Sequence, residues 1–356
     1  MGKVTLRTRL DDGLELERVS CPIGVLLIIF EARPEVIANI ASLAIKSGNA
    51  AILKGGKEST ESFIAVSKII SRALEQTAVP IAAIQLLTTR DVIPELLKLD
   101  EHVDLVIPRG SNELVSYVKN NTKIPVLGHA DGLCSIYLCA DADQDMAVKV
   151  LLDAKLGYTA ACNAVETLLV DEAALTTILP VVASSLHANG VSLRCDAQAK
   201  AALEESLPLN ETVLLQDANE TDYSTEFLDL ILAIKTIPAS GSSPSIDLAI
   251  AHINSHGSKH TDVILTSSAD KARRFQAGVD AACVFWNAST RMSDGMRFGF
   301  GTEVGVSTNK THARGPVGLD GMMIYKYLIR GSGQTAGEYF EGPGGKTWKH
   351  EPLPVG

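Results

Sequence analysis

The chain has 356 residues, 46% of them hydrophobic, and carries a formal net charge of −10. This length exceeds what one hydrophobic core normally serves, so we expect two domains. The negative charge argues against nucleic acids and anionic membranes as partners, and no apolar run reaches the ~18 residues of a membrane span.

The first predicted element is a β-hairpin. Residues 4–10 and 14–19 alternate apolar and polar side chains on either side of "DDG", which suits a tight turn. An isolated two-stranded ribbon is marginal in water, so we expect the hairpin to pack on another subunit of a homo-oligomer.

Strand–helix units follow the hairpin. We expect strand 23–30 with helix 34–46, strand 50–54 with helix 59–75, strand 83–87 with helix 91–98, and strand 103–107 with a helix from about Ser111. This alternation predicts a parallel sheet flanked by helices.

The alternation resumes after Cys162 and predicts a second α/β unit. We expect its strands at 165–170, 191–194, 230–236, 262–266 and 281–286, and its helices at 172–187, 197–206, 245–255 and 269–277. Residues 322–329 alternate like an edge strand. The tail from Gly331 is rich in Gly, Pro and charge, so we expect it to be poorly ordered.

The segment "LKGGKES" (53–59) has part of the pattern of a phosphate-binding loop. It departs from the P-loop motif because Glu58 replaces Ser or Thr and Ala51 stands where Gly is required. It still places glycines and lysines after a strand, and Ser59 could cap a helix whose N-terminus attracts phosphate.

The segment "IPRGSNEL" (107–114) repeats this plan with Arg109, Gly110 and Ser111. Two such loops at the carboxyl ends of adjacent parallel strands suit a nucleotide. The alternative, favoured equally, is that both segments are ordinary strand–helix connections that bind no ligand.

The segment "LGYTAACNAVETLLV" (156–170) places Cys162 among small residues directly before a strand. A cysteine in a small-residue loop can be reached by a substrate, although core filler is the commoner role of a free cysteine. The six cysteines lack the spacing of a disulfide framework, and the N-terminus lacks the apolar core of a signal peptide. We therefore expect a reduced, cytoplasmic chain.

Several histidines are candidate site residues. His252, His256 and His260 are spaced four apart, but Gly257 should end their helix and turn His260 away, so a structural role is favoured over metal binding. His129 lies in a turn, "GHADG", where it could contact a ligand or bond only to the backbone.

Two loops near the C-terminus could face a substrate. "GFGTEVG" (299–305) lacks the spacing of a dinucleotide-binding motif, and we interpret it as a substrate-side loop. "VFWNASTRMSDG" (284–295) carries Arg291, which could bind a carboxylate bidentately, or it is simply a solvated connector.

Taken in order, these segments resemble the γ-glutamyl phosphate reductase family of the aldehyde dehydrogenase superfamily, with fungal-like features. The resemblance runs from about residue 3 to residue 330. It rests on "EARPEV" (31–36), "SGNAAILKGGKES" (47–59), "DLVIPRGSNEL" (104–114), "YTAACNAVETLLV" (158–170), "AIAHINSHGSKHTDVI" (249–264) and "NASTR…FGFGTEV…THARGP" (287–316).

The resemblance implies an aldehyde-dehydrogenase-like α/β fold with two parallel-sheet domains and a hairpin for oligomerisation. The expected divisions are the hairpin at 1–20, an NADP-binding domain at 21–155, a catalytic domain at 156–300, a return segment and oligomerisation strand at 301–330, and a flexible tail at 331–356. Family members carry a further N-terminal helical region, so we expect those helices of the cofactor domain to be missing from this sequence.

The function implied is NADPH-dependent reduction of L-glutamyl 5-phosphate to L-glutamate 5-semialdehyde in proline biosynthesis, with phosphate released from a cysteine thioester. The stretch 126–133 lacks the glutamate that activates water in hydrolytic aldehyde dehydrogenases, which favours reduction. Glutamate 5-kinase is an implied partner. Two alternatives stay open: an NAD(P)-dependent aldehyde dehydrogenase of another substrate, and a truncated, non-catalytic paralogue that assembles with full-length subunits.

The resemblance also assigns roles to residues. Cys162 matches the catalytic cysteine, and Asn163 is a candidate oxyanion donor. The cofactor residues implied are Lys54, Lys57, Ser59, Gly110, Ser111 and Glu226. The substrate residues expected are Arg33, His129, Asn287, Ser289 and Arg291. No metal is expected.

Overall fold

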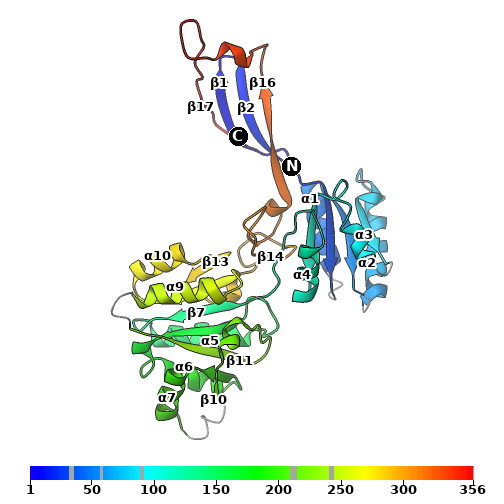
Figure 1. Ribbon diagram of the computed structural model, residues 1–356. Coiled ribbons are helices and arrows are strands. Elements are labelled where there is room, and N and C mark those ends of the chain that lie inside the picture. The colour runs from blue at the N-terminus through cyan, green and yellow to red at the C-terminus, as the bar shows by residue number, and fades with distance from the viewer. Residues whose placement is uncertain (32–35, 57–58, 89–91, 209–214, 240–243, 356) are drawn as a thin grey trace.

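The computed structural model describes residues 1–31, 36–56, 59–88, 92–208, 215–239 and 244–355 (Figure 1). Two parallel sheets with covering helices form separate bodies, and an antiparallel arm projects from between them. The predicted α/β class with two parallel-sheet units is confirmed. Within the described ranges, every helix is too short or too polar to cross a membrane.

The first body is a four-stranded parallel sheet in the order β5-β4-β3-β6. Its strands are β3 (Val25–Phe30), β4 (Ala50–Gly55), β5 (Ile84–Leu87) and β6 (Leu105–Arg109); its helices are α1 (Val36–Ser47), α2 (Thr60–Leu74), α3 (Ile93–Leu96) and α4 (Asn112–Asn120), with a 3₁₀ turn η2 (Ile81–Ala83). The chain runs from β3 to β5 on one side and returns to β6 on the other. Ligands bind at such a switch point, beyond the carboxyl ends of the strands.

Strand β3 is apolar throughout because both of its faces are buried. Leu26 and Ile28 join the core cluster that includes α1, whereas Leu27 and Ile29 join the cluster on the opposite face. This two-sided burial is why the sequence shows a continuous apolar run there in place of alternation.

The second body is a seven-stranded parallel sheet in the order β10-β9-β11-β8-β7-β12-β13. Its strands are β7 (Cys134–Leu138), β8 (Val165–Asp171), β9 (Ser192–Cys195), β10 (Leu215–Asp217), β11 (Ile231–Ile237), β12 (Thr261–Leu265) and β13 (Cys283–Trp286). Helices α5 (Gln144–Leu156), α6 (Leu179–His187) and α7 (Ala197–Ser206) cover one face, and α9 (Ser245–His256) and α10 (Ala269–Gly278) cover the other.

Two expectations for this body are wrong in detail. Strand β7 and all but the last residue of helix α5 lie within the 21–155 range expected for the cofactor domain, yet β7 pairs with β8 and β12 in the second sheet. The single helix predicted over 172–187 is divided into a 3₁₀ turn, η3 (Glu172–Ala174), and α6. Pro180 lies in the first turn of α6, where its missing N–H costs nothing, and so fixes the helix start.

The arm is a four-stranded antiparallel sheet in the order β16-β2-β1-β17. Its strands are β1 (Val4–Asp11), β2 (Leu14–Pro22), β16 (Met323–Arg330) and β17 (Glu351–Pro352). The predicted hairpin is confirmed, and β16 pairs with β2 along its full length. The hairpin is therefore part of a larger sheet within its own chain.

The expectation of a poorly ordered tail is wrong. Strand β17 pairs with β1, and a 3₁₀ turn, η7 (Ala336–Glu338), precedes Tyr339, whose ring stacks on Trp348 at 3.7 Å. Tyr339 also donates a hydrogen bond of 2.8 Å to Asp11. Two aromatic rings anchor the tail to the arm despite its Gly- and Pro-rich composition.

The return segment connects the two bodies with the arm. After η5 (Thr290–Met292) it forms an antiparallel pair, β14 (Val306–Ser307) with β15 (Gly315–Pro316), and a 3₁₀ turn, η6 (Asp320–Met322). Val304, Val317 and Met322 are buried in the core of the first body. The loop 299–305 is thereby held between the two sheets.

Candidate active site

A cavity of about 730 Å³ lies where the two bodies and the return segment meet. The lining includes residues from 107–112 at the end of β6, 127–131 before β7, 158–163 before β8, 291–297 in and after η5, and 303–306 of the return segment. The loop 299–305, interpreted from sequence as substrate-side, contributes Glu303, Val304 and Gly305.

Cys162 lies in this cavity. It is half-buried, in the turn between α5 and β8, while Cys134, Cys139, Cys195 and Cys283 are buried. The turn is closed by a hydrogen bond from Ala164 N–H to the Ala161 carbonyl (2.8 Å).

Gly132 crosses closely behind the loop that carries Cys162. A Cβ at this position would overlap the carbonyl oxygen and Cα of Cys162, so only glycine fits. Its N–H donates to Glu226 Oε1 at 3.0 Å, which ties a third segment to the loop. Sequence reasoning missed this glycine because the close approach joins segments far apart along the chain.

Asn163 and Arg291 link the Cys162 loop to the loop after β13. Asn163 is buried, its Nδ2 donates to the Ser293 carbonyl at 2.9 Å, and its Oδ1 accepts from Arg291. The amide thus orients Arg291, which differs from the oxyanion-donor role predicted for Asn163. Burial lowers the pKa of Arg291, whose guanidinium lines the cavity and is close enough to Cys162 to interact electrostatically.

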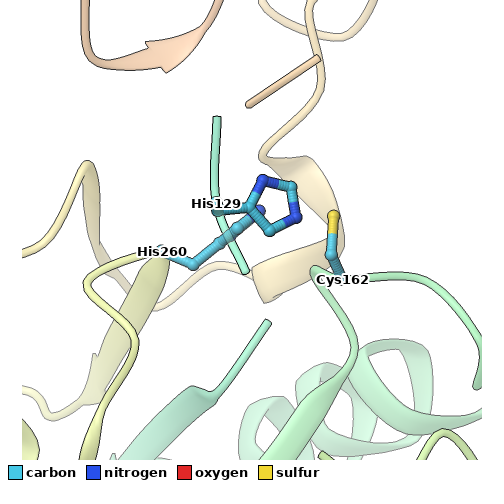
Figure 2. Close-up of side chains that lie close together, drawn as sticks. All are labelled: His129, Cys162 and His260. Carbon is cyan, nitrogen blue, oxygen red and sulfur yellow. The ribbon is translucent and has the colours of Figure 1, made fainter. Parts of the chain in front are cut away.

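His129 and His260 lie beside the sulfur (Figure 2). One ring nitrogen of each and Cys162 Sγ all lie within 4.8 Å of one another. His129 Nδ1 lies 2.7 Å from the Val306 carbonyl oxygen, which can only accept, so Nδ1 carries the proton. Burial lowers the pKa of His129, so its ring is neutral at pH 7 and Nε2 is an unprotonated acceptor.

The three spaced histidines separate as expected after Gly257. His252 and His256 stack on each other on α9 at 4.2 Å, and burial lowers the pKa of His252 to about 3. His260 is fully buried on the other side, with its ring 4.9 Å from that of His129. Its position beside Cys162 was not predicted, because the sequence shows where the helix ends and not what the next segment meets.

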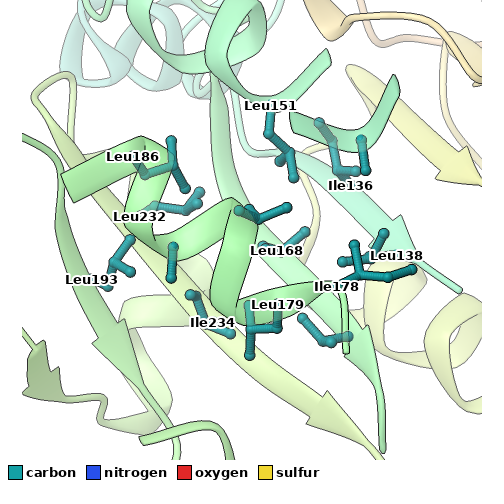
Figure 3. Packing of buried hydrophobic residues seen from close by; sticks show 14 of the residues in the cluster. Ile136, Leu138, Leu151, Leu168, Ile178, Leu179, Leu186, Leu193, Leu232 and Ile234 are labelled. Atoms are coloured by element: carbon teal, nitrogen blue, oxygen red, sulfur yellow. The ribbon is translucent and has the colours of Figure 1, made fainter. Parts of the chain in front are cut away.

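A buried ion pair anchors β8, the strand that follows the Cys162 loop. Lys155 of α5 donates to Glu166 of β8 at 2.7 Å and to the Val165 carbonyl at 3.0 Å, and both side chains are almost wholly inaccessible. Burial lowers the pKa of Lys155 and raises the pKa of Glu166 to about 7. The core in Figure 3 includes Leu151 of α5 and Leu168 of β8, the helix and strand that also carry this pair.

A second cavity of about 370 Å³ adjoins the first at the carboxyl ends of β3, β4 and β5. Both cavities share Phe30 and Glu31, and Phe63, Leu87 and Tyr117 give the second an apolar wall. Lys54 lines it, with Nζ donating to the Gly55 carbonyl at 2.7 Å. Lys57 lies outside the described residues.

Ser59 precedes α2 at the N-cap position, but its side chain makes no capping hydrogen bond, contrary to expectation. Ser111, in contrast, caps α4 by accepting from the Leu114 N–H. The Ser111 N–H donates to the Glu31 carboxylate at 2.7 Å, so the N-terminus of this helix already binds an anionic oxygen. A Cβ at Gly110 would overlap that carboxylate.

Of the remaining predicted site residues, one lines the first cavity, two bond to the backbone, and one is not described. Glu226 lines the first cavity, and burial raises its pKa. Asn287 and Ser289 serve the backbone: the Asn287 amide bonds to both the N–H and the carbonyl of Thr266, and Ser289 caps η5. Arg33 lies outside the described residues.

The residues that line the two joined cavities are of the kinds that bind a dinucleotide. The apolar wall near Phe63 suits a flat ring, and Lys54 lies beside it. The α4 N-terminus, between the two cavities, holds the Glu31 carboxylate in this structure, so a phosphate group would have to replace that carboxylate there. The first cavity then leads to Cys162.

Comparison with known proteins gives the family of the chain. The family model described as "Aldehyde dehydrogenase family" matches residues 8–200. A Schizosaccharomyces pombe protein named "Probable gamma-glutamyl phosphate reductase" is 56% identical over 355 residues, covering 100% of this chain and 77% of that protein. The Saccharomyces cerevisiae gamma-glutamyl phosphate reductase is 50% identical over 366 residues, covering 100% and 79%.

A solved structure agrees with these relatives. The crystal structure of gamma-glutamyl phosphate reductase from Thermotoga maritima superposes with a TM-score of 0.87 at 38% identity, covering 94% of this chain and 78% of that one. The chain is therefore an oxidoreductase of the aldehyde dehydrogenase family and belongs to its γ-glutamyl phosphate reductases.

Proposed function

We propose that this chain reduces L-glutamyl 5-phosphate to L-glutamate 5-semialdehyde with release of phosphate, in proline biosynthesis. The names of its relatives support the substrate. The observation that carries the chemistry is the position of Cys162, half-buried in a cavity between the two parallel-sheet bodies and beside a neutral histidine.

In the first step Cys162 attacks the acyl carbon of the substrate. His129 Nε2 takes the thiol proton, the S–C bond forms, and the C–O bond to phosphate breaks with its electron pair leaving on phosphate. The product on the chain is a thioester at Cys162. The small side chains of Ala160 and Ala161 beside the sulfur leave room for the acyl phosphate.

Two guanidinium groups favour an anionic substrate at this place. Arg291 and Arg297 both line the cavity, and Arg297 donates to the Arg291 carbonyl, so the two lie side by side. Guanidinium binds phosphate and carboxylate in a fork, and burial of Arg291 strengthens its interactions. We assign the pair to the charged groups of the substrate.

The aldehyde dehydrogenase family uses NAD or NADP, and we propose NADPH here. Lys54 would lie at the adenosine end, Gly110 and Ser111 at the pyrophosphate, and Glu226 at the nicotinamide ribose; Lys57 and Ser59 are further candidates for the adenosine end. When bound, NADPH supplies the hydride that reduces the acyl group.

The arm supports a homo-oligomer. Tyr325, Tyr327 and Ile329 of β16 are between 50% and 61% exposed, which is unusual for large apolar side chains on one strand. We propose a cytoplasmic homo-oligomer assembled through the arm, and association with glutamate 5-kinase stays a prediction.

The reverse reaction tests the proposal without the unstable acyl phosphate. Purified protein with glutamate semialdehyde, NADP and phosphate should reduce NADP. Cys162→Ala should abolish this, while Cys21→Ser in the arm should leave it intact. Turnover that needs no phosphate would instead indicate a hydrolytic aldehyde dehydrogenase, and a folded but inactive protein would indicate the non-catalytic alternative.

A further inference from the structure

We propose that His129, Cys162 and His260 form a three-ligand site for Zn²⁺, and that the bound cation reversibly blocks the nucleophile. That a cation binds is inferred from the positions of these three side chains and does not depend on the proposed function. The inhibition that follows from it rests on the proposed function, since it requires that Cys162 be the reacting group.

The ligand atoms are already gathered. A ring nitrogen of each histidine and the sulfur lie within 4.8 Å of one another, and they come from three segments around one point (Figure 2). Zn²⁺ binds nitrogen at about 2.0–2.1 Å and sulfur at about 2.3 Å, which places two ligands of one tetrahedral ion about 3.5 Å apart. The three atoms would have to approach one another by at most about 1.3 Å to reach that spacing.

The histidines are oriented as metal ligands are. His129 has its Nδ1–H on the Val306 carbonyl, which leaves Nε2 facing the sulfur. His260 Nδ1 lies 2.9 Å from Thr261 Oγ1. Ligating histidines generally hold their outer nitrogen in such a hydrogen bond, which fixes the tautomer and the ring.

His260 adds an independent sign of a ligand. The residue is fully buried, and its Nε2 has no hydrogen-bond partner in the part of the chain that the structure describes. An unsatisfied buried nitrogen is costly, and a cation between it and the sulfur would satisfy it.

The donor set selects the cation. Two imidazole nitrogens and a thiolate favour Zn²⁺ over Mg²⁺ or Ca²⁺, which prefer oxygen. Three protein ligands leave a fourth position, and here it would open onto the 730 Å³ cavity. A cation held there occupies the sulfur lone pair that attacks the substrate.

Spectroscopy tests binding separately from catalysis. We expect the metal-free protein to bind one Co²⁺ per chain, in place of Zn²⁺, and to show a sulfur-to-cobalt charge-transfer absorption band. Added Zn²⁺ should displace the Co²⁺ and abolish this band. The band should vanish in Cys162→Ser. His260→Gln should weaken binding at least 10-fold, whereas His256→Gln, the matched control on α9, should not change it.

Activity tests the block. Zn²⁺ should inhibit the reverse reaction, a chelator should restore it, and Mg²⁺ at the same concentration should have no effect. His260→Gln should remain active and need at least 10-fold more Zn²⁺ for inhibition. If that buried substitution prevents folding, His129→Gln provides the same comparison in the Co²⁺ titration.

Each outcome decides the question. Binding that depends on Cys162 but is equal in the His260→Gln and His129→Gln variants would overturn the site, as would absence of Co²⁺ binding by the native protein. A thiolate–Co²⁺ band in a protein without reductase activity would support the site and contradict the proposed function.

Discussion

At the scale of single residues, the proposed reactivity of Cys162 depends on the residues around its sulfur. The small residues before it were visible in the sequence, and they suggested an accessible sulfur. Two of its neighbours, His260 and Gly132, come from other segments and could not be assigned by pattern. His129 was expected near a ligand, but its place beside the sulfur was not. A local sequence pattern can indicate a candidate residue, but only the fold shows which other residues lie near it.

The protonation of His129 should set the acid limb of the pH profile. Its pKa lies below 6.5 because burial disfavours the charged ring, so Nε2 stays available as pH falls below that value. We expect kcat/KM to hold at pH 6.5 and to fall only at lower pH. His129→Gln should lower kcat/KM by about 10²–10⁴-fold, the usual contribution of a proton acceptor. An acid limb above pH 6.5 would contradict this assignment.

Gly132 should be irreplaceable for activity. In Gly132→Ala the new methyl group would overlap the Cys162 carbonyl and displace the nucleophile loop. Misplacement of a reacting group by about 1 Å can cost about 10²-fold, and we expect a fall in kcat of that order. Gly337→Ala, where a Cβ meets no atom within 4 Å, is the control and should behave as the native protein. Equal kcat values in the two variants would argue against the close approach.

At the scale of elements, most strands could be predicted because buried parallel strands are continuous apolar runs. Strand order could not be predicted, so the residues of β7 fell within the range 21–155 expected for the cofactor domain, although β7 pairs in the second sheet. Lys155 is a similar case. A lysine on an amphipathic helix is typical of a solvated face, and its partner Glu166 lies on the next strand.

Breaking the Lys155–Glu166 pair should destabilise the junction of α5 and β8. Lys155→Met leaves the Glu166 carboxyl buried without its cation, which costs about 3–5 kcal/mol in the free energy of unfolding. The double variant Lys155→Met/Glu166→Leu should recover most of this, because no unpaired charge remains. Denaturant unfolding measures both. A double variant as unstable as the single one would show that lost packing, and not the unpaired charge, explains the effect.

At the scale of the whole molecule, the arm is the feature that the sequence described least completely. Alternation predicted β1, β2 and β16, while the tail composition concealed the stacking of Tyr339 on Trp348 that anchors β17. The overall composition of the tail does not reveal single contacts, and here the stacking of two aromatic rings holds a short polar segment against the arm. The arm leaves the apolar side chains of β16 exposed.

Charging that strand should weaken assembly without unfolding the chain. We expect Ile329→Asp to shift the protein to a smaller species in size-exclusion chromatography with light scattering, because a carboxylate in a subunit interface is costly to desolvate. Val181→Asp, on the exposed face of α6, is the matched control and should not change the mass. The prediction fails if the native protein is itself a monomer.

A phosphate-free burst experiment tests the central claim most directly, namely that Cys162 carries the acyl group. With glutamate semialdehyde and NADP but no phosphate, Cys162 adds to the aldehyde carbon, this carbon gives up a hydride to NADP, and the resulting thioester has no phosphate to take the acyl group. We predict about one NADPH per chain, then no further turnover, and a glutamyl adduct on the peptide containing Cys162 by mass spectrometry. Continued turnover, or an adduct on any other residue, would contradict the account.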